Sequence, residues 1–172
     1  MSRPILVISI HKWLLIVGIV RSIIADIGVA ACIVKNDKIL LVEEARGSKS
    51  GYWGMPKGAV DKHEAPSIAV LRELNEECGI TGIVEGLIAI RERMYENTLG
   101  IFIAYSVSTE DLDIKIDFDE ISDYGWFDIT EFDGINWISK AMREIAESSL
   151  LGNKLSITDY TNQRGNHYIV YS

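Results

Sequence analysis

Apolar and polar residues follow one another in patterns that predict strands in the first third of the chain. Two β-like runs, residues 27–34 (IGVAACIV) and 38–45 (KILLVEEA), are joined by a polar turn at residues 35–37. Residues 45–58 then hold four glycines and a proline, which is typical of a loop. This part of the chain therefore predicts two strands followed by a long glycine-rich loop.

Residues 58–80 (GAVDKHEAPSIAVLRELNEECGI) change to helical spacing. Pro66 suits the first helical turn, where its missing N–H is no loss, and Gly79 suits the left-handed position that ends a helix. Because a helix turns by 100° per residue, apolar residues and glutamates separate onto different sides. The apolar stripe predicted to face the core comprises Ile68, Leu71, Leu74 and Cys78, and the glutamates are Glu73, Glu76 and Glu77.

After this helix the pattern returns to strands and ends with a second helix. The predicted elements are strands at 83–95 and 100–107, an exposed acidic loop at 109–120, a short strand at 121–129, and a helix at 136–150. The polar tail ends in YIVYS, which is compatible with a last strand. This order predicts an α/β (α+β) fold class, with a mixed β-sheet between helices.

The length of 172 residues suits one domain with a well-buried core. We expect a main domain at 26–150, an N-terminal extension at 1–25, and a tail at 151–172 packed on the domain. Lys12 and Arg21 interrupt the apolar runs of the extension, so a membrane-spanning helix of about 20 apolar residues does not fit. Extra strands that cover a sheet edge or a dimer partner are preferred there over a signal peptide.

Charge and cysteine content narrow the partners. Lysine and arginine number 17 against 25 acids, and the net charge of −8 argues against a broad nucleic-acid surface. Cys32 and Cys78 lack metal-ligand spacing, so they are interpreted as reduced core thiols of a cytoplasmic protein. We therefore expect a small-molecule substrate, no nucleic acid and no membrane, with a homodimer as an alternative to a monomer.

The glutamate-rich helix face is the feature that needs a chemical explanation. Like charges at these spacings cost a helix roughly 0.2–0.5 kcal/mol per pair. A solvated surface is the commonest reason for such a face, but here three acids stack beside a single arginine, Arg72, behind a glycine-rich loop. A divalent cation such as Mg²⁺ would turn the repulsion into coordination, because it takes oxygen ligands and keeps several waters.

The wider spacing is more specific than the helix alone. The Nudix box is matched at every defined position by Gly58, Glu64, Arg72-Glu73-Leu74, Glu76-Glu77 and Gly79-Ile80. The chain thus resembles the Nudix hydrolases. The resemblance implies the αβα sandwich of that family and the cleavage of a P–O–P bridge with Mg²⁺, or alternatively Mn²⁺.

The resemblance also implies roles for individual residues. Arg72 would orient the glutamates through charged hydrogen bonds. The implied metal ligands are Glu73, Glu76, Glu77 and a backbone carbonyl near Gly58. The implied catalytic residues of the box are Glu73, Glu76 and Arg72, whereas Glu64 and Gly79 are structural.

The resemblance leaves two choices for the general base, because it is a box glutamate in some Nudix hydrolases and an acid on a later loop in others. Glu120 lies where that later acid often occurs, so it completes the predicted catalytic residues. An exposed member of an acidic loop is an equally weighted interpretation, and Asp117, Asp119 and Asp123 are near enough in sequence to be confused with it.

Substrate contacts rest on weaker signals. Arg46, Lys49 and Lys57 flank the glycine-rich loop and suit phosphates, with surface solubility as the alternative. Tyr95 and Trp126 could stack on a base, although an aromatic residue in a strand more often belongs to the core. The run WGMPKG before the box resembles that of several Nudix branches, including dinucleoside polyphosphate hydrolases.

These patterns together predict an enzyme: a Mg²⁺-dependent pyrophosphohydrolase of a nucleoside di-, tri- or polyphosphate, with dinucleoside polyphosphates and nucleoside triphosphates favoured. The alternatives are a non-catalytic module that senses a nucleotide and a hydrolase of a non-nucleotide diphosphate. An isoprenyl diphosphate isomerase is disfavoured, because neither cysteine suits its catalytic thiol. The base, the sugar, the phosphate number and the cleaved bond stay open.

Overall fold

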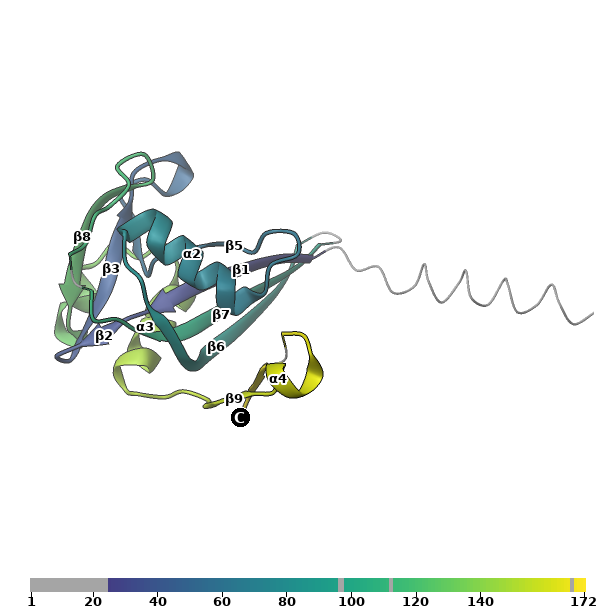
Figure 1. Cartoon of the computed structure of the whole chain (residues 1–172). Helices are drawn as coiled ribbons and strands as arrows, with labels where there is room; N and C mark the ends of the chain where they lie inside the picture. The colour runs from purple at the N-terminus through teal and green to yellow at the C-terminus, as the bar shows by residue number, and fades with distance from the viewer. Residues whose placement is uncertain (1–24, 96–97, 112, 168) are drawn as a thin grey trace, which may run out of the picture.

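A computed structural model of the chain describes residues 25–95, 98–111, 113–167 and 169–172 (Figure 1). The extra strands expected in the N-terminal extension lie outside the described residues.

A mixed four-stranded sheet forms the centre of the molecule. Its strand order is β5 (Lys57–Ala59), β1 (Ala25–Cys32), β7 (Thr98–Ser108) and β6 (Ile83–Tyr95). Strand β1 runs parallel to β7, and the two outer pairs are antiparallel. A second, antiparallel sheet joins β2 (Val34–Lys35), β3 (Lys38–Glu44), β4 (Trp53–Gly54) and β8 (Ile121–Phe127), with β8 paired to β3.

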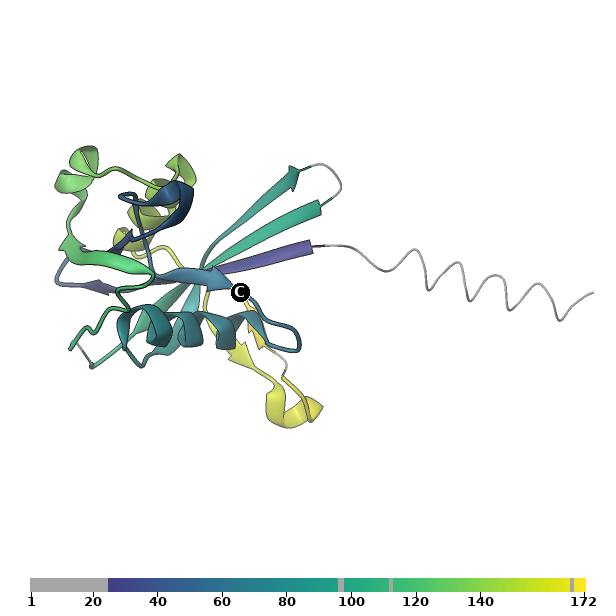
Figure 2. The ribbon, with the colours of Figure 1, turned by 90° about the horizontal axis from the view of Figure 1, so that it is seen from above.

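Helix α2 (Pro66–Cys78) and helix α3 (Lys140–Leu150) lie on opposite sides of the sheets (Figure 2). Alternate residues of β1 serve the two sides: Val29 and Ala31 pack in the core under α2, whereas Ala30 and Cys32 pack in the core under α3. Because both faces of the second half of this strand are buried, residues 29–32 are continuously apolar rather than alternating. The αβα sandwich with a mixed sheet is thus confirmed.

Helix α2 begins and ends where the sequence indicates. Pro66 is its first residue, and Gly79 follows its last residue with a φ of 68°. Leu74 and Cys78 are fully buried, but Ile68 is 52% exposed, so its predicted core position is wrong. The helix is rotated so that smaller residues meet the sheet instead of Ile68; these are Ala69 and Val70.

Some segments contain helices or strands that the sequence did not predict, and one predicted helix begins at a different residue. The predicted loop at 45–58 contains a short 3₁₀ helix η1 and strands β4 and β5, and the late helix starts at Lys140 rather than at residue 136. The remaining elements are η1 (Gly47–Lys49), η2 (Ile129–Gly134), β9 (Ile157–Asp159), α4 (Thr161–Arg164) and β10 (Ile169–Tyr171). The side chain of Ser139 accepts a hydrogen bond from the Met142 N–H and so caps α3.

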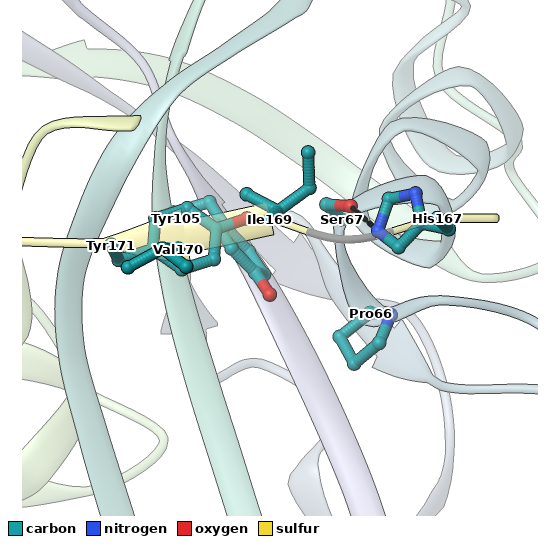
Figure 3. Close-up of a pocket in the computed structure, with 7 residues that line it drawn as sticks. All are labelled: Pro66, Ser67, Tyr105, His167, Ile169, Val170 and Tyr171. Carbon is teal, nitrogen blue, oxygen red and sulfur yellow. Dashed lines mark hydrogen bonds between the residues drawn. The ribbon is translucent and has the colours of Figure 1, made fainter. Parts of the chain in front are cut away.

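The C-terminal hairpin β9–β10 packs beside the start of α2 and borders a pocket of about 370 Å³ (Figure 3). Tyr171 of β10 lies against Tyr105 of β7, with ring centroids 5.7 Å apart. The hydroxyl of Ser67 lies 3.4 Å from Nε2 of His167. This pocket is at the first turn of α2, whereas the three glutamates lie in the second half of the helix.

Both cysteines are buried and free, as expected of core thiols. Burial raises the pKa of Cys32 and of Cys78 to about 12, so both stay protonated near neutral pH. Among the residues that the structure describes, no helix is long and apolar enough to cross a membrane.

The rotation of α2 predicts unequal costs for two truncations on this helix. Leu74→Ala removes a fully buried side chain and should lower the free energy of unfolding by about 2–5 kcal/mol. Ile68→Ala, the matched control, should cost less than about 1 kcal/mol because half of that side chain is already in water. Urea denaturation measures both, and equal losses would contradict the observed orientation of α2.

Candidate active site

The side chain of Arg72 ties three carboxylates to the loop before the helix. Its Nε and Nη2 donate to the two oxygens of Glu64, each at 3.0 Å. Its Nη1 donates to Glu73 at 2.9 Å and to Glu76 at 2.8 Å. Nη2 also donates to the carbonyl of Ala59 at 2.9 Å. One planar guanidinium therefore sets the positions of three acids and one backbone segment.

These hydrogen bonds shift the pKa values of Arg72 and Glu64. Hydrogen bonds, first of all to Glu64, raise the pKa of Arg72. The Arg72 bonds lower the pKa of Glu64, and the backbone N–H of Asp61, which donates to Oε2 of Glu64 at 3.0 Å, lowers it further. Glu64 is thus ionised and anchors the loop at residues 59–64 to the helix.

Glycine at position 58 is required by the approach of Glu73. A Cβ at Gly58 would lie 1.9 Å from Cδ of Glu73, which no side chain could tolerate. Gly58 belongs to β5, at the edge of the central sheet, where it pairs with Val29 of β1. The contact brings a helix carboxylate directly onto the backbone of an edge strand.

Glu77 is buried beneath the same face of the helix. Its Oε2 accepts a hydrogen bond of 2.9 Å from the backbone N–H of Lys57. Burial raises the pKa of Glu77 to about 8, Lys57 opposes the shift, and the carboxylates of Glu44 and Glu73 add to it. This concentration of negative charge in a dehydrated place is what a bound cation would relieve.

The carboxylate of Glu73 is also partly buried and lies near other carboxylates. Burial raises its pKa, Arg72 opposes the shift, and the carboxylates of Glu76 and Glu120 add to it. Glu120, which is distant in sequence, is therefore close enough to Glu73 to contribute to raising its pKa.

The acidic segment before β8 brings Glu120 to the cluster. The N–H groups of Lys115 and Asp117 donate to the carbonyls of Cys78 and Glu77, at 2.8 Å and 3.1 Å, and so satisfy the end of α2. The carbonyl of Glu120 then accepts a bond of 2.8 Å from the N–H of Ala45. The segment is a loop without buried side chains among its described residues, in line with the predicted exposed loop, and its backbone is anchored at both ends.

The predicted phosphate contacts are spread around the glycine-rich loop. Nη2 of Arg46 lies 2.7 Å from Oε1 of Glu120, and Lys57 pairs with Glu44. Nζ of Lys49 donates to the carbonyl of Ile138 at 3.1 Å, and lies 5.0 Å from the centroid of the Tyr52 ring. Arg46 and Lys57 therefore adjoin the acidic cluster, whereas Lys49 is tethered toward η2 and α3.

Among the side chains that it describes, the structure does not place either of the two predicted aromatic contacts, Trp126 and Tyr95, beside the acidic cluster. Trp126 packs, partly buried, against the core under α2. Tyr95 is the last residue of β6, and its side chain lies outside the described residues. The structure thus does not bring Trp126 out into the cluster.

Sequence reasoning missed Glu44. This residue ends strand β3, pairs with Lys57, and lies close enough to raise the pKa of Glu77. A signal was present, because two adjacent acids, Glu43 and Glu44, end an otherwise apolar strand.

The donor set fits a hard divalent cation. Among the described residues, no three acid, histidine or cysteine side chains converge tightly enough to count as a metal centre as they stand. Glu73, Glu76 and Glu77 nevertheless each use one carboxylate oxygen in hydrogen bonds and leave the other without a donor from the described chain. Those three oxygens are the ligand type that Mg²⁺ and Mn²⁺ prefer.

Comparison with known proteins agrees with this geometry. A family model described as "NUDIX domain" matches residues 26–148. The RNA pyrophosphohydrolase of Pelagibacter ubique is 27% identical, over 59% of this chain and 75% of that protein. The CTP pyrophosphohydrolase of Escherichia coli is 38% identical, over 38% of this chain and 49% of that protein. Several further relatives match over less than half of their own length.

The fold has solved counterparts. The crystal structure of a MutT NUDIX hydrolase from Burkholderia pseudomallei superposes with a TM-score of 0.62 at 26% identity, covering 72% of this chain and 97% of that one. Relatives of this chain include proteins named as pyrophosphohydrolases, which are enzymes that hydrolyse phosphoric anhydride bonds. The chain therefore belongs to the Nudix hydrolase family.

Proposed function

We propose that this protein is a Mg²⁺-dependent pyrophosphohydrolase of a nucleoside di-, tri- or polyphosphate. The observation that carries the proposal is the cluster in which Arg72 holds Glu64, Glu73 and Glu76 beside Gly58. Relatives named for RNA and CTP pyrophosphohydrolysis support a nucleotide-linked substrate. Dinucleoside polyphosphates and nucleoside triphosphates are the favoured classes.

Cleavage of a P–O–P bridge needs positive charge at the phosphates. The anionic substrate repels an attacking water, and further charge builds on the leaving phosphate. A divalent cation, when bound, supplies that charge and lowers the pKa of water. Glu73, Glu76 and Glu77 would hold it, joined by the backbone carbonyl of Gly58.

The residues around these ligands have separate duties. Arg72 keeps Glu73 and Glu76 oriented through its hydrogen bonds. Glu120 is the proposed general base: one of its carboxylate oxygens accepts from Arg46, and the other has no donor among the described residues and is free to take a proton. A box glutamate is the competing base.

Other classes lead to different observations. A module that only senses a nucleotide would bind it without releasing product, and a hydrolase of a non-nucleotide diphosphate would ignore nucleotides. We further propose Mn²⁺ as an alternative ion, a homodimer as an alternative to a monomer, and a cytoplasmic location.

The first experiment is a screen for released nucleotide and phosphate in the presence of Mg²⁺. It covers nucleoside triphosphates, diadenosine tetraphosphate and a non-nucleotide diphosphate, each with an EDTA control. We expect turnover of at least one nucleotide and its loss in EDTA. Nucleotide binding without any product would contradict the enzymatic proposal and support the sensing module.

Glu76→Gln should abolish turnover while the fold is kept. The substitution removes a ligand charge with little change in volume, and the side chain is 55% exposed, so stability should change little. Glu144→Gln on α3 is the matched control, because that side chain is also exposed and also pairs with a cation four residues away. Retained activity in Glu76→Gln would refute the metal-ligand role.

Glu120→Gln tests the general base. A positioned base contributes roughly 10²–10⁴-fold to the rate, so the substitution should decrease kcat by a factor in that range. Asp119→Asn, one residue earlier on the same segment, should retain activity within about threefold. A loss of less than tenfold for Glu120→Gln would assign the base to the helix glutamates instead.

A further inference from the structure

A second charged feature lies near the box, on the opposite side of the central sheet from α2. Arg91 and Arg93 of β6 line a pocket of about 230 Å³ that extends across β7 and β1 to Gly58 and Ala59 of β5. The pocket is smaller than sites for whole drug-sized ligands, which measure roughly 300–1,000 Å³. It therefore suits one group of a larger molecule that continues around the β5 edge toward the acidic cluster.

The strand register aligns this pocket with the box. Arg91 pairs with Phe102, Phe102 pairs with Gly28, and Gly28 pairs with Ala59, so these four residues form one row across the sheet. Three strand spacings place the backbone of Arg91 about 14 Å from that of Ala59. An extended substrate lying along this row would reach from the arginines to the edge strand β5, and it would pass around that edge to meet Glu73 on the α2 side.

The floor of the pocket is kept low by glycines. A Cβ at Gly28 would lie 2.9 Å from the Phe102 ring and 3.5 Å from the carbonyl oxygen of Gly58, the proposed metal ligand. A Cβ at Gly100 would lie 2.7 Å from Nε of Arg93. Side chains at these two positions would displace the arginine or separate the pocket from the Gly58 carbonyl.

Neither arginine has a carboxylate partner among the described residues. Cζ of Arg91 lies 4.9 Å from the centroid of the Phe102 ring, and its Nε is buried without a hydrogen-bond acceptor. The other arginines whose side chains are described each pair with an acid; these are Arg46, Arg72 and Arg143. Arg93 is exposed to water, so it is the buried, unpartnered Nε of Arg91, in a chain of net charge −8, that indicates an absent anionic partner.

One acid also lines the pocket and limits the choice of ligand. Asp26 of β1 pairs with Gly100, which in turn pairs with Arg93, so the two charged residues are two strands, about 10 Å, apart. The three charged lining residues leave a net charge of +1. This balance suits a single phosphate group near the β6 side better than a large polyanion that fills the pocket.

We propose that Arg91 and Arg93 bind a phosphate of the substrate that lies beyond the anhydride being cleaved. The inference rests on the proposed function and narrows its substrate class to nucleotides with a long phosphate chain, such as dinucleoside polyphosphates. A nucleoside diphosphate is too short to occupy both places. The arginines touch a part of the substrate that does not react, so they contribute to binding rather than to the chemical step.

Binding without metal tests the anion site separately from catalysis. Inorganic tripolyphosphate is titrated in EDTA against the wild type, Arg91→Gln, Arg93→Gln and the control Arg143→Gln, with calorimetry as the readout. Each pocket variant should raise the dissociation constant for tripolyphosphate roughly tenfold or more, since a charged hydrogen bond is lost. The control should stay within twofold. No binding by the wild type, or equal affinities in all four proteins, would overturn the proposal.

Steady-state kinetics then test the substrate class. For diadenosine tetraphosphate, both pocket variants should raise KM about tenfold and leave kcat within about threefold. For ADP, KM should change less than threefold. An equal rise with both substrates would overturn the assignment to a phosphate beyond the cleaved bond. If tripolyphosphate binds as expected but no substrate is turned over, the proposed function fails while the anion site stands.

Discussion

The hydrogen-bond network of Arg72 is the interaction on which the candidate site depends. One guanidinium bonds to Glu64, Glu73 and Glu76, and it also bonds to the backbone at Ala59. Without the Arg72 guanidinium, the acids three and four residues apart on α2 would repel one another, and their side chains would turn toward water. With it, they are held against the edge strand β5, where the helix, the loop and the sheet meet.

The site also depends on burial, which sets its electrostatics. Glu77 occupies a position of α2 that would ordinarily hold an apolar residue, and burial raises its pKa to about 8. Glu44, which lies outside the Nudix box, places a further carboxylate near Glu77 and adds to the rise of its pKa. Such an arrangement is unfavourable to an empty folded chain and becomes favourable once a cation is bound, so ligand binding is expected to stabilise the fold.

Opposite charges lie at the two ends of one strand row. Acids gather near Gly58 and Ala59, while Arg91 and Arg93 stand three strands away on the other edge of the same sheet. A polyphosphate needs metal-bound charge compensation at the bond that breaks and direct cationic contacts elsewhere. One extended ligand can meet both requirements if it lies along the face of the central sheet and passes around the β5 edge to the acids on the α2 side.

Local sequence determined the limits of α2, the order of the main strands and the family, because helix ends, apolar runs and the box spacing are all written within short stretches of chain. Pro66 and Gly79 are the clearest examples. The exposure of Ile68, the approach of Glu120 and the pairing of Arg91 with Phe102 depended on the tertiary structure. Helix rotation and strand register follow from packing between segments that are distant in sequence, and periodicity carries no information about that packing.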